Sequence, residues 1–205
     1  MVTLYDASML IHETMIVYPH NPAPKIEQYA HIPTEVVNES KISLGCHTGT
    51  HVDAPFHVRN DGGKADSIDL HQFYGPCLVV DLTHIDREIH QKDLEFIPLE
   101  PGLILCLKTQ NSLIREEKFR TDFVHVKIDA ARYLIGKGIK TLGFDYLSVK
   151  KFGGDDDVHE LLITNLTLFE GLNLAHVPAG QYTFVGLPLK VACDGAPARV
   201  LLIAD

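Results

Sequence analysis

The chain has 205 residues, of which 45% are hydrophobic and 22% charged, enough to bury one substantial core, so we expect a single domain over residues 1–205. Its formal net charge is −9, which excludes a broad basic surface for nucleic acid or an anionic membrane and leaves a small molecule as the expected partner. No apolar run is long enough to cross a bilayer and no secretory signal opens the sequence, so we expect a cytoplasmic protein.

Strand-forming runs recur along the whole chain, and several are apolar at consecutive positions, which indicates strands covered on both faces. We expect strands within residues 2–8, 40–46, 77–83, 102–108, 141–147, 166–171, 181–189 and 199–204. Helices are expected within residues 88–96, 129–138 and 157–164. In the second helix Asp129 is the candidate N-cap, and Gly136 or Gly138 is available to end it. The irregular alternation of strands and helices predicts a mixed α/β domain.

Two segments stand outside this alternation. Residues 153–157, GGDDD, have the composition of a solvated loop. Residues 47–57, HTGTHVDAPFH, contain four side chains able to bind a metal, namely His47, His51, Asp53 and His57.

The spacing of these four side chains suits a helix face, but the intervening residues do not. Gly49 weakens a helix interior, and Pro55 removes a backbone donor and clashes with the preceding turn. In an extended chain, residues separated by an even number point to the same side. We therefore expect a bent extended segment that presents all four side chains to one cavity, while Val52 and Phe56 pack away from it.

Neutral imidazole and carboxylate are the usual protein ligands of Zn²⁺ and Mn²⁺, and three protein ligands leave a position open for water. A zincin helix is excluded because Thr48 stands where that motif has Glu, and no Cys pair accompanies the histidines. A hydrogen-bonded turn with scattered histidines is the alternative reading. The number of candidate ligands in eleven residues favours a metal site.

The segment resembles the signature His-x-Gly-Thr-His-x-Asp-x-Pro-x-His of the cyclase-like metal-dependent hydrolases, and every fixed position is present. Bacterial kynurenine formamidases belong to that family, and isatin hydrolases are related to them. The resemblance continues through residues 6–24, 142–153, 157–172 and 187–202. It implies a barrel-like core of mixed strands with flanking helices, of the swivelling β/β/α type.

The resemblance also implies two metal ions per chain that share Asp53, with zinc as the first choice and manganese as the alternative. His57 is expected to act as the catalytic acid and base, and Tyr18 to contact the substrate. The metal ligands implied by the resemblance are His47, His51, Asp53, His159 and Glu170.

The chain departs from the family pattern at two places. Between His159 and Glu170 it is one residue shorter, so the alignment needs a gap near residues 163–167. Tyr18-Pro19-His20-Asn21 stands where kynurenine formamidases carry an aromatic-Pro-Gly-Asp turn, which predicts a differently shaped loop near the substrate. Tyr18 keeps an aromatic ring that can stack on an aryl substrate.

The implied activity is that of an arylformamidase, which hydrolyses N-formyl-L-kynurenine to L-kynurenine and formate in tryptophan breakdown. Three alternatives remain open from the residues: opening of a cyclic amide such as isatin, a metal-dependent cyclase or dehydratase, and a non-enzymatic protein whose metal only holds a loop. The resemblance further implies a homodimer or a higher homo-oligomer.

Overall fold

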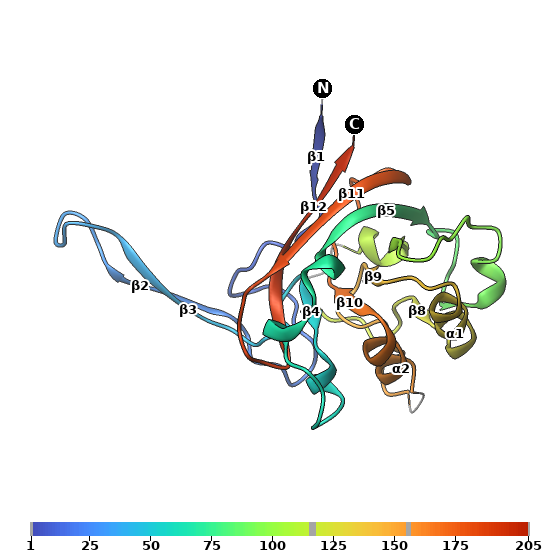
Figure 1. Ribbon diagram of the computed structural model, residues 1–205. Helices are drawn as coiled ribbons and strands as arrows, with labels where there is room; N and C mark the ends of the chain where they lie inside the picture. The colour runs from blue at the N-terminus through green and yellow to red at the C-terminus, as the bar shows by residue number, and fades with distance from the viewer. Residues whose placement is uncertain (1, 115–117, 155–156, 205) are drawn as a thin grey trace.

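The computed structural model describes residues 2–114, 118–154 and 157–204. Its centre is a closed barrel of seven mixed parallel and antiparallel strands (Figure 1). Around the barrel the strands are β12 (Gly195–Ala204), β11 (Gly180–Pro188), β5 (Tyr74–Asp81), β7 (Ile104–Lys108), β9 (Thr141–Phe144), β10 (Thr167–Glu170) and β4 (His51–Asp53), and β4 pairs back to β12. The N-terminal strand β1 (Thr3–Asp6) adds to β12 beyond the barrel.

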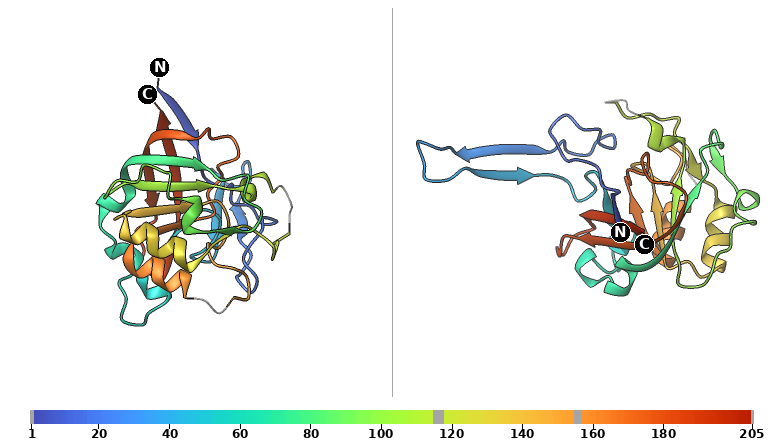
Figure 2. Two further views of the ribbon diagram at one scale, coloured as in Figure 1. Left: turned by 90° about the vertical axis from the view of Figure 1, so that its right-hand side faces the viewer. Right: turned by 90° about the horizontal axis from the view of Figure 1, so that it is seen from above.

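Smaller elements surround the barrel. Helices α1 (Ile128–Gly136) and α2 (Val158–Asn165) contact each other and cover the side formed by β9 and β10 (Figures 1 and 2). Strands β6 (Glu88–Ile89) and β8 (His125–Val126) form a short parallel pair. Among the described residues, no helix is long and apolar enough to cross a membrane.

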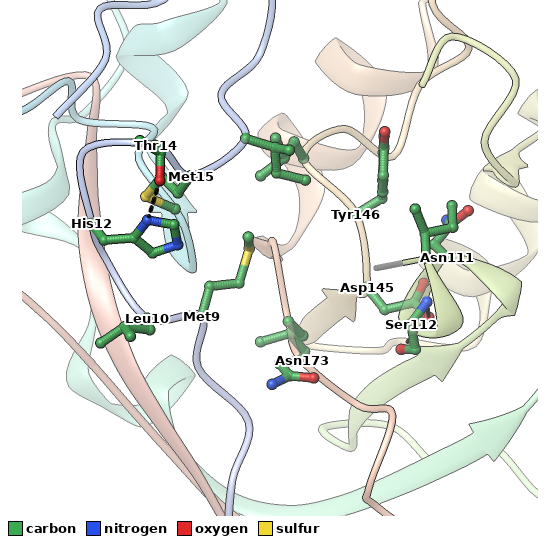
Figure 3. A pocket seen from close by; sticks show the side chains of 14 residues that line it. Met9, Leu10, His12, Thr14, Met15, Asn111, Ser112, Asp145, Tyr146 and Asn173 are labelled. Carbon is green, nitrogen blue, oxygen red and sulfur yellow. Dashed lines mark hydrogen bonds between the residues drawn. The ribbon is translucent and has the colours of Figure 1, made fainter. Parts of the chain in front are cut away.

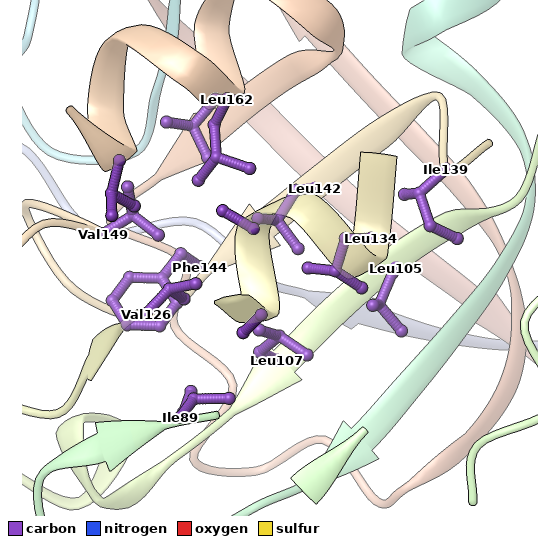
Figure 4. Packing of buried hydrophobic residues seen from close by; sticks show 14 of the residues in the cluster. Ile89, Leu105, Leu107, Val126, Leu134, Ile139, Leu142, Phe144, Val149 and Leu162 are labelled. Atoms are coloured by element: carbon purple, nitrogen blue, oxygen red, sulfur yellow. The ribbon is translucent and has the colours of Figure 1, made fainter. Parts of the chain in front are cut away.

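The core has two layers, because the central strands are apolar on both faces. On the outer face of β7 and β9, Leu105, Leu107 and Phe144 pack against the helices (Figure 4). The alternate residues of β7, Ile104 and Cys106, join a second cluster inside the barrel. Both faces being covered explains why this strand is a continuous apolar run, as expected for parallel strands.

The predicted mixed α/β fold with a barrel-like core is confirmed, and each of the eight expected strand regions contains a strand. The two later helices are confirmed as α1 and α2. The helix expected over residues 88–96 is wrong, since Glu88 and Ile89 pair with β8 and only Gln91–Asp93 form a 3₁₀ turn. Ile89 is fully buried there, so tertiary packing overrides the local preference for helix.

The start of α1 also differs from the expectation. Its N-cap is Lys127, and the carboxylate of Asp129 instead accepts a hydrogen bond from the Gln91 backbone. Gly138 follows the helix with φ of +73°, so it supplies the left-handed conformation that ends a helix. Of the GGDDD loop, residues 155 and 156 lie outside the described residues.

Strands β2 (Lys25–Ala30) and β3 (Glu39–Ser43) form a hairpin arm that projects away from the barrel (Figures 1 and 2). Every residue of β3 is exposed, and only the last residue of β2 is buried. The arm leaves the barrel after the Tyr18–Asn21 turn and returns just before His47.

The segment at residues 47–50, here called the histidine loop, is clamped against the end of β10. The hydroxyl of Thr50 donates a hydrogen bond to the carbonyl of Gly171 at 2.5 Å. Gly171 has φ of +68°, and a Cβ on it would collide with the backbone carbonyl of Gly49. Glycine is therefore required at this contact both by conformation and by space.

We expect Gly171→Ala to lower the free energy of unfolding by about 2–4 kcal/mol, because the added methyl meets backbone that cannot rotate away. Urea denaturation measures this change. Gly136→Ala is the matched control, since nothing lies within 4 Å of the added Cβ in α1, and it should equal or exceed wild-type stability. Wild-type stability of Gly171→Ala would contradict the proposed clamp.

Candidate metal centre

The carboxylate of Asp53, at the end of β4, is surrounded by three imidazoles. Its Oδ1 lies 2.7 Å from Nδ1 of His47 and 3.3 Å from Nε2 of His51. Its Oδ2 lies 2.9 Å from Nε2 of His159. Burial opposes the charge on Asp53, but the hydrogen bonds from these histidines outweigh it and hold its pKa well below the ordinary value.

A second buried carboxylate belongs to Glu170, at the end of β10. Its Oε1 accepts a hydrogen bond from the Val149 backbone at 2.7 Å and lies 3.6 Å from Nε2 of His159. Burial, together with the charge of Asp53, raises the pKa of Glu170 to about 7. Two carboxylates buried side by side repel each other, so this site favours a cation between them.

Strand pairing explains how three of these side chains meet. His51 and Asp53 are two residues apart on β4 and therefore share one face of the strand. Glu170 is the direct cross-strand partner of His51. Nδ1 of His51 donates to the carbonyl of Gly49 at 2.9 Å, which leaves the lone pair of Nε2 facing the carboxylates.

The bent extended conformation expected for residues 47–57 is only partly correct. The strand comprises His51–Asp53 alone, and Val52 packs in the core as expected. His47 reaches the cluster from a turn, and His57 from the end of the 3₁₀ turn Pro55–His57, where Pro55 occupies the first position. The alternation rule therefore accounts for His51 and Asp53, while turn geometry brings in the other two.

All five expected ligands come together in two groups of three that share Asp53. In each group the candidate ligand atoms lie within 4.8 Å of one another. The one-residue shortening before β10 does not separate His159 from Glu170, because the first turn of α2 carries His159 to the barrel. The two groups are His47, His51 and Asp53, and Asp53, His159 and Glu170.

Asp194, immediately before β12, is a neighbour of this cluster that the sequence does not reveal. Its Oδ2 lies 2.8 Å from Nε2 of His47 and 3.5 Å from Nδ1 of His57. Burial opposes a charge on His47, but Asp53 and Asp194 outweigh it and raise its pKa to about 9. An Asp-Gly pair before a strand is indistinguishable in sequence from an ordinary turn, so only the fold identifies this contact.

A cavity of about 460 Å³ opens beside the cluster, and Tyr18 lines it together with His57. The Tyr18 ring packs edge-on against Phe119 with ring centres 5.1 Å apart. The turn after Tyr18 closes with a hydrogen bond from Asn21 N to Tyr18 O, and His20 has φ of +74°. His20 thus adopts the left-handed conformation that glycine favours at this position of a turn.

A second cavity of about 370 Å³ lies between the N-terminal segment and the residues after β9 (Figure 3). Its carboxylate, Asp145, accepts hydrogen bonds from the backbone and side chain of both Thr109 and Ser112. Its histidine, His12, contacts Thr14 at 3.1 Å. This cavity contains none of the expected ligands, all of which line the cavity of about 460 Å³ instead.

Comparison with known proteins identifies the family of this chain. Residues 5–151 match the sequence profile of the family described as "Putative cyclase". The chain belongs to the cyclase family. The resemblance to that family, first seen in residues 47–57, is therefore confirmed.

Members and relatives of the cyclase family are similar over most of the chain. A kynurenine formamidase of Bacillus cereus is 35% identical over 169 residues, which are 81% of this chain and 80% of that protein. A predicted metal-dependent hydrolase of Bacillus stearothermophilus has 38% identity and a TM-score of 0.87, covering 99% of this chain and 98% of the other. An isatin hydrolase bound to thioisatinate, at 21% identity and a TM-score of 0.85 over 99% and 92% of the two chains, shares the fold.

The protonation of the ligands predicts how metal affinity depends on pH. A metal binds neutral imidazole and ionised carboxylate, so a proton on His47, with a pKa of about 9, must leave first, as must one on Glu170, with a pKa of about 7. Zinc affinity should therefore rise about tenfold per pH unit from pH 7 to 9, and more steeply below pH 7. Chelator competition between pH 6 and 9, corrected for the chelator's own protons, measures the slope; a flat profile contradicts it.

Proposed function

We propose that this cyclase-family protein is a metal-dependent hydrolase of C–N bonds other than peptide bonds, and that it hydrolyses N-formyl-L-kynurenine to L-kynurenine and formate in tryptophan catabolism. The observation that carries the proposal is the pair of ligand groups sharing Asp53, beside a cavity of about 460 Å³. The similarity to kynurenine formamidases over 81% of the chain supports the substrate.

The proposed cofactor is two zinc ions per chain, with manganese as the alternative, since His and carboxylate ligands suit both metals. Asp53 offers Oδ1 to the group with His47 and Oδ2 to the group with His159, so its carboxylate could be shared by two ions. A titration of the metal-free protein with zinc should saturate at two ions per chain. Asp53→Ala should lose both ions, because it removes the ligand common to the two groups.

The proposed chemistry divides between the ions and His57. A divalent ion, when bound, lowers the pKa of water and polarises a carbonyl oxygen. The His57 side chain is 32% exposed and lines the cavity, so it takes a proton from the attacking water and delivers it to the departing aryl nitrogen. Burial lowers the pKa of His57, which keeps the ring neutral and able to accept that proton. The formyl C–N bond breaks, and the oxygen of water remains in formate.

The lining of the cavity favours N-formylkynurenine over isatin. Tyr18 and Leu147 offer apolar surface to an aryl ring. Lys150 and Lys151 line the same cavity, and neither ammonium has an ion-pair partner among the described residues. N-formylkynurenine carries an α-carboxylate that these cations attract, whereas isatin has no ionised group.

The proposal includes a homo-oligomer and a cytoplasmic location. One face of the hairpin arm is uncharged, where Ile26 and Ile42 pair across the strands with exposed fractions of 40% and 59%. The opposite face carries the pair Glu27 and Lys41. An exposed pair of isoleucines on an uncharged face of an isolated hairpin suits contact with a second copy of the chain. The four cysteines are all free, which suits a reducing compartment.

We expect zinc-loaded protein to hydrolyse N-formyl-L-kynurenine with a higher kcat/KM than formanilide, which keeps the reacting amide but lacks the amino-acid side chain. Isatin should be a poorer substrate than either. His57→Ala should lower kcat about 10²- to 10⁴-fold with the zinc content unchanged, as expected for loss of an acid and base. No turnover of N-formyl-L-kynurenine refutes the proposed substrate.

Two lysine variants test the preference within the same assay. Lys150→Gln and Lys151→Gln should raise KM for N-formyl-L-kynurenine several-fold and leave formanilide unchanged, because only the first substrate carries a carboxylate. Equal effects on both substrates contradict carboxylate recognition by these residues.

Sedimentation equilibrium should give at least twice the chain mass of 22.8 kDa. Ile42→Glu should shift the protein toward the monomer by placing a charge on the apolar face of the arm. Ser43→Glu is the matched control, because it points to the opposite face beside Lys25. A monomeric wild-type protein at all concentrations contradicts the oligomer.

A further inference from the structure

We propose that Asp194 is a positioning residue of this centre, whose carboxylate fixes the ring of the metal ligand His47 and the ring of His57 at once. The activity expected of His57 rests on the proposed function. The effect on His47 does not, since it concerns metal binding alone.

The contact with His47 fixes which nitrogen is available to a metal. Nδ1 of His47 faces Asp53 Oδ1 at 2.7 Å, while Nε2 faces Asp194 Oδ2 at 2.8 Å. Both carboxylates accept and do not donate, so both ring nitrogens of His47 donate when no metal is bound. A metal bound beside Asp53 would replace the proton on Nδ1, and Asp194 would keep the proton on Nε2. A carboxylate behind a histidine ligand also makes that ligand more basic.

The same oxygen, Oδ2 of Asp194, lies 3.5 Å from Nδ1 of His57. Among the described residues, no other carboxylate oxygen lies within 4 Å of a nitrogen of this ring. The His57 and His47 rings are neighbours, with centres 4.1 Å apart. Asp194 thus orients His57 through Nδ1 and leaves Nε2 as the nitrogen that exchanges protons with substrate and water.

The backbone holds Asp194 rigidly enough for this role. Its carbonyl accepts a hydrogen bond from Ala54 N at 2.9 Å, and the next residue, Gly195, pairs with Asp53 between β12 and β4. A Cβ on Gly195 would lie 2.7 Å from Cε1 of His47, so the chain passes directly against that ring. Barrel closure therefore fixes Asp194 and Asp53 on either side of His47.

The first experiment measures metal binding and needs no substrate. Zinc affinity is measured by chelator competition for Asp194→Ala and for Asp66→Ala, an exposed aspartate without a contact to the centre. Asp194→Ala should bind the same number of zinc ions about 10- to 100-fold more weakly, and Asp66→Ala should match wild type. Wild-type affinity in Asp194→Ala overturns the proposal. A smaller number of bound ions also overturns it, because Asp194 would then be a ligand.

The second experiment measures catalysis with saturating zinc and with N-formyl-L-kynurenine as the substrate. Asp194→Ala should lower kcat at least tenfold with KM within twofold of wild type, and Asp194→Glu should recover part of the loss. Adding Asp194→Ala to His57→Ala should cost little more, since the two residues act together. Fully multiplicative losses overturn the link to His57. If the wild-type protein does not hydrolyse N-formyl-L-kynurenine, the proposed function fails. The zinc-affinity measurement still decides whether Asp194 positions His47.

Discussion

The structure depends on one buried carboxylate, that of Asp53, which is compensated by imidazoles from three separate parts of the chain. A lone carboxylate with 2% exposure would be strongly destabilising at this depth. His47 in the histidine loop, His51 on β4 and His159 on α2 each approach one of its oxygens. The position of these three elements is therefore tied to a single side chain.

Closure of the barrel makes this convergence possible. β4 has only three residues, yet it pairs with β10 on one edge and β12 on the other. Both neighbours present a glycine where the histidine loop must pass, Gly171 beside Gly49 and Gly195 beside His47. Glu170 ends β10 and Asp194 immediately precedes β12, so the segments that close the barrel also bring these two carboxylates to the candidate metal centre.

The sequence predicts what depends on local pattern. The alternation of His51 and Asp53 is a local property, and the apolar run of β7 reports burial on both faces. Glu170 and His159 approach Asp53 only because segments distant in the sequence pack together. Their prediction as metal ligands therefore depends on the resemblance to a family. No local sequence pattern distinguishes Asp194 from the aspartate of an ordinary turn. The helix predicted for residues 88–96 is wrong because β6 forms by pairing with β8, which the local sequence does not show.

The raised pKa values of the cluster follow from its buried carboxylates, which attract positive charge, whether from a proton or from a metal ion. Burial disfavours charge on His47 and His159, yet the pKa of each is raised, because Asp53 and its neighbouring carboxylates attract a positive charge. Protons on these rings balance the buried carboxylates in the absence of a metal. A divalent ion bound at this centre would replace those protons and keep the charge balance, so the candidate ligands could stay where the barrel holds them. Such preorganisation reduces the conformational cost of binding, and it follows from the fold rather than from the metal.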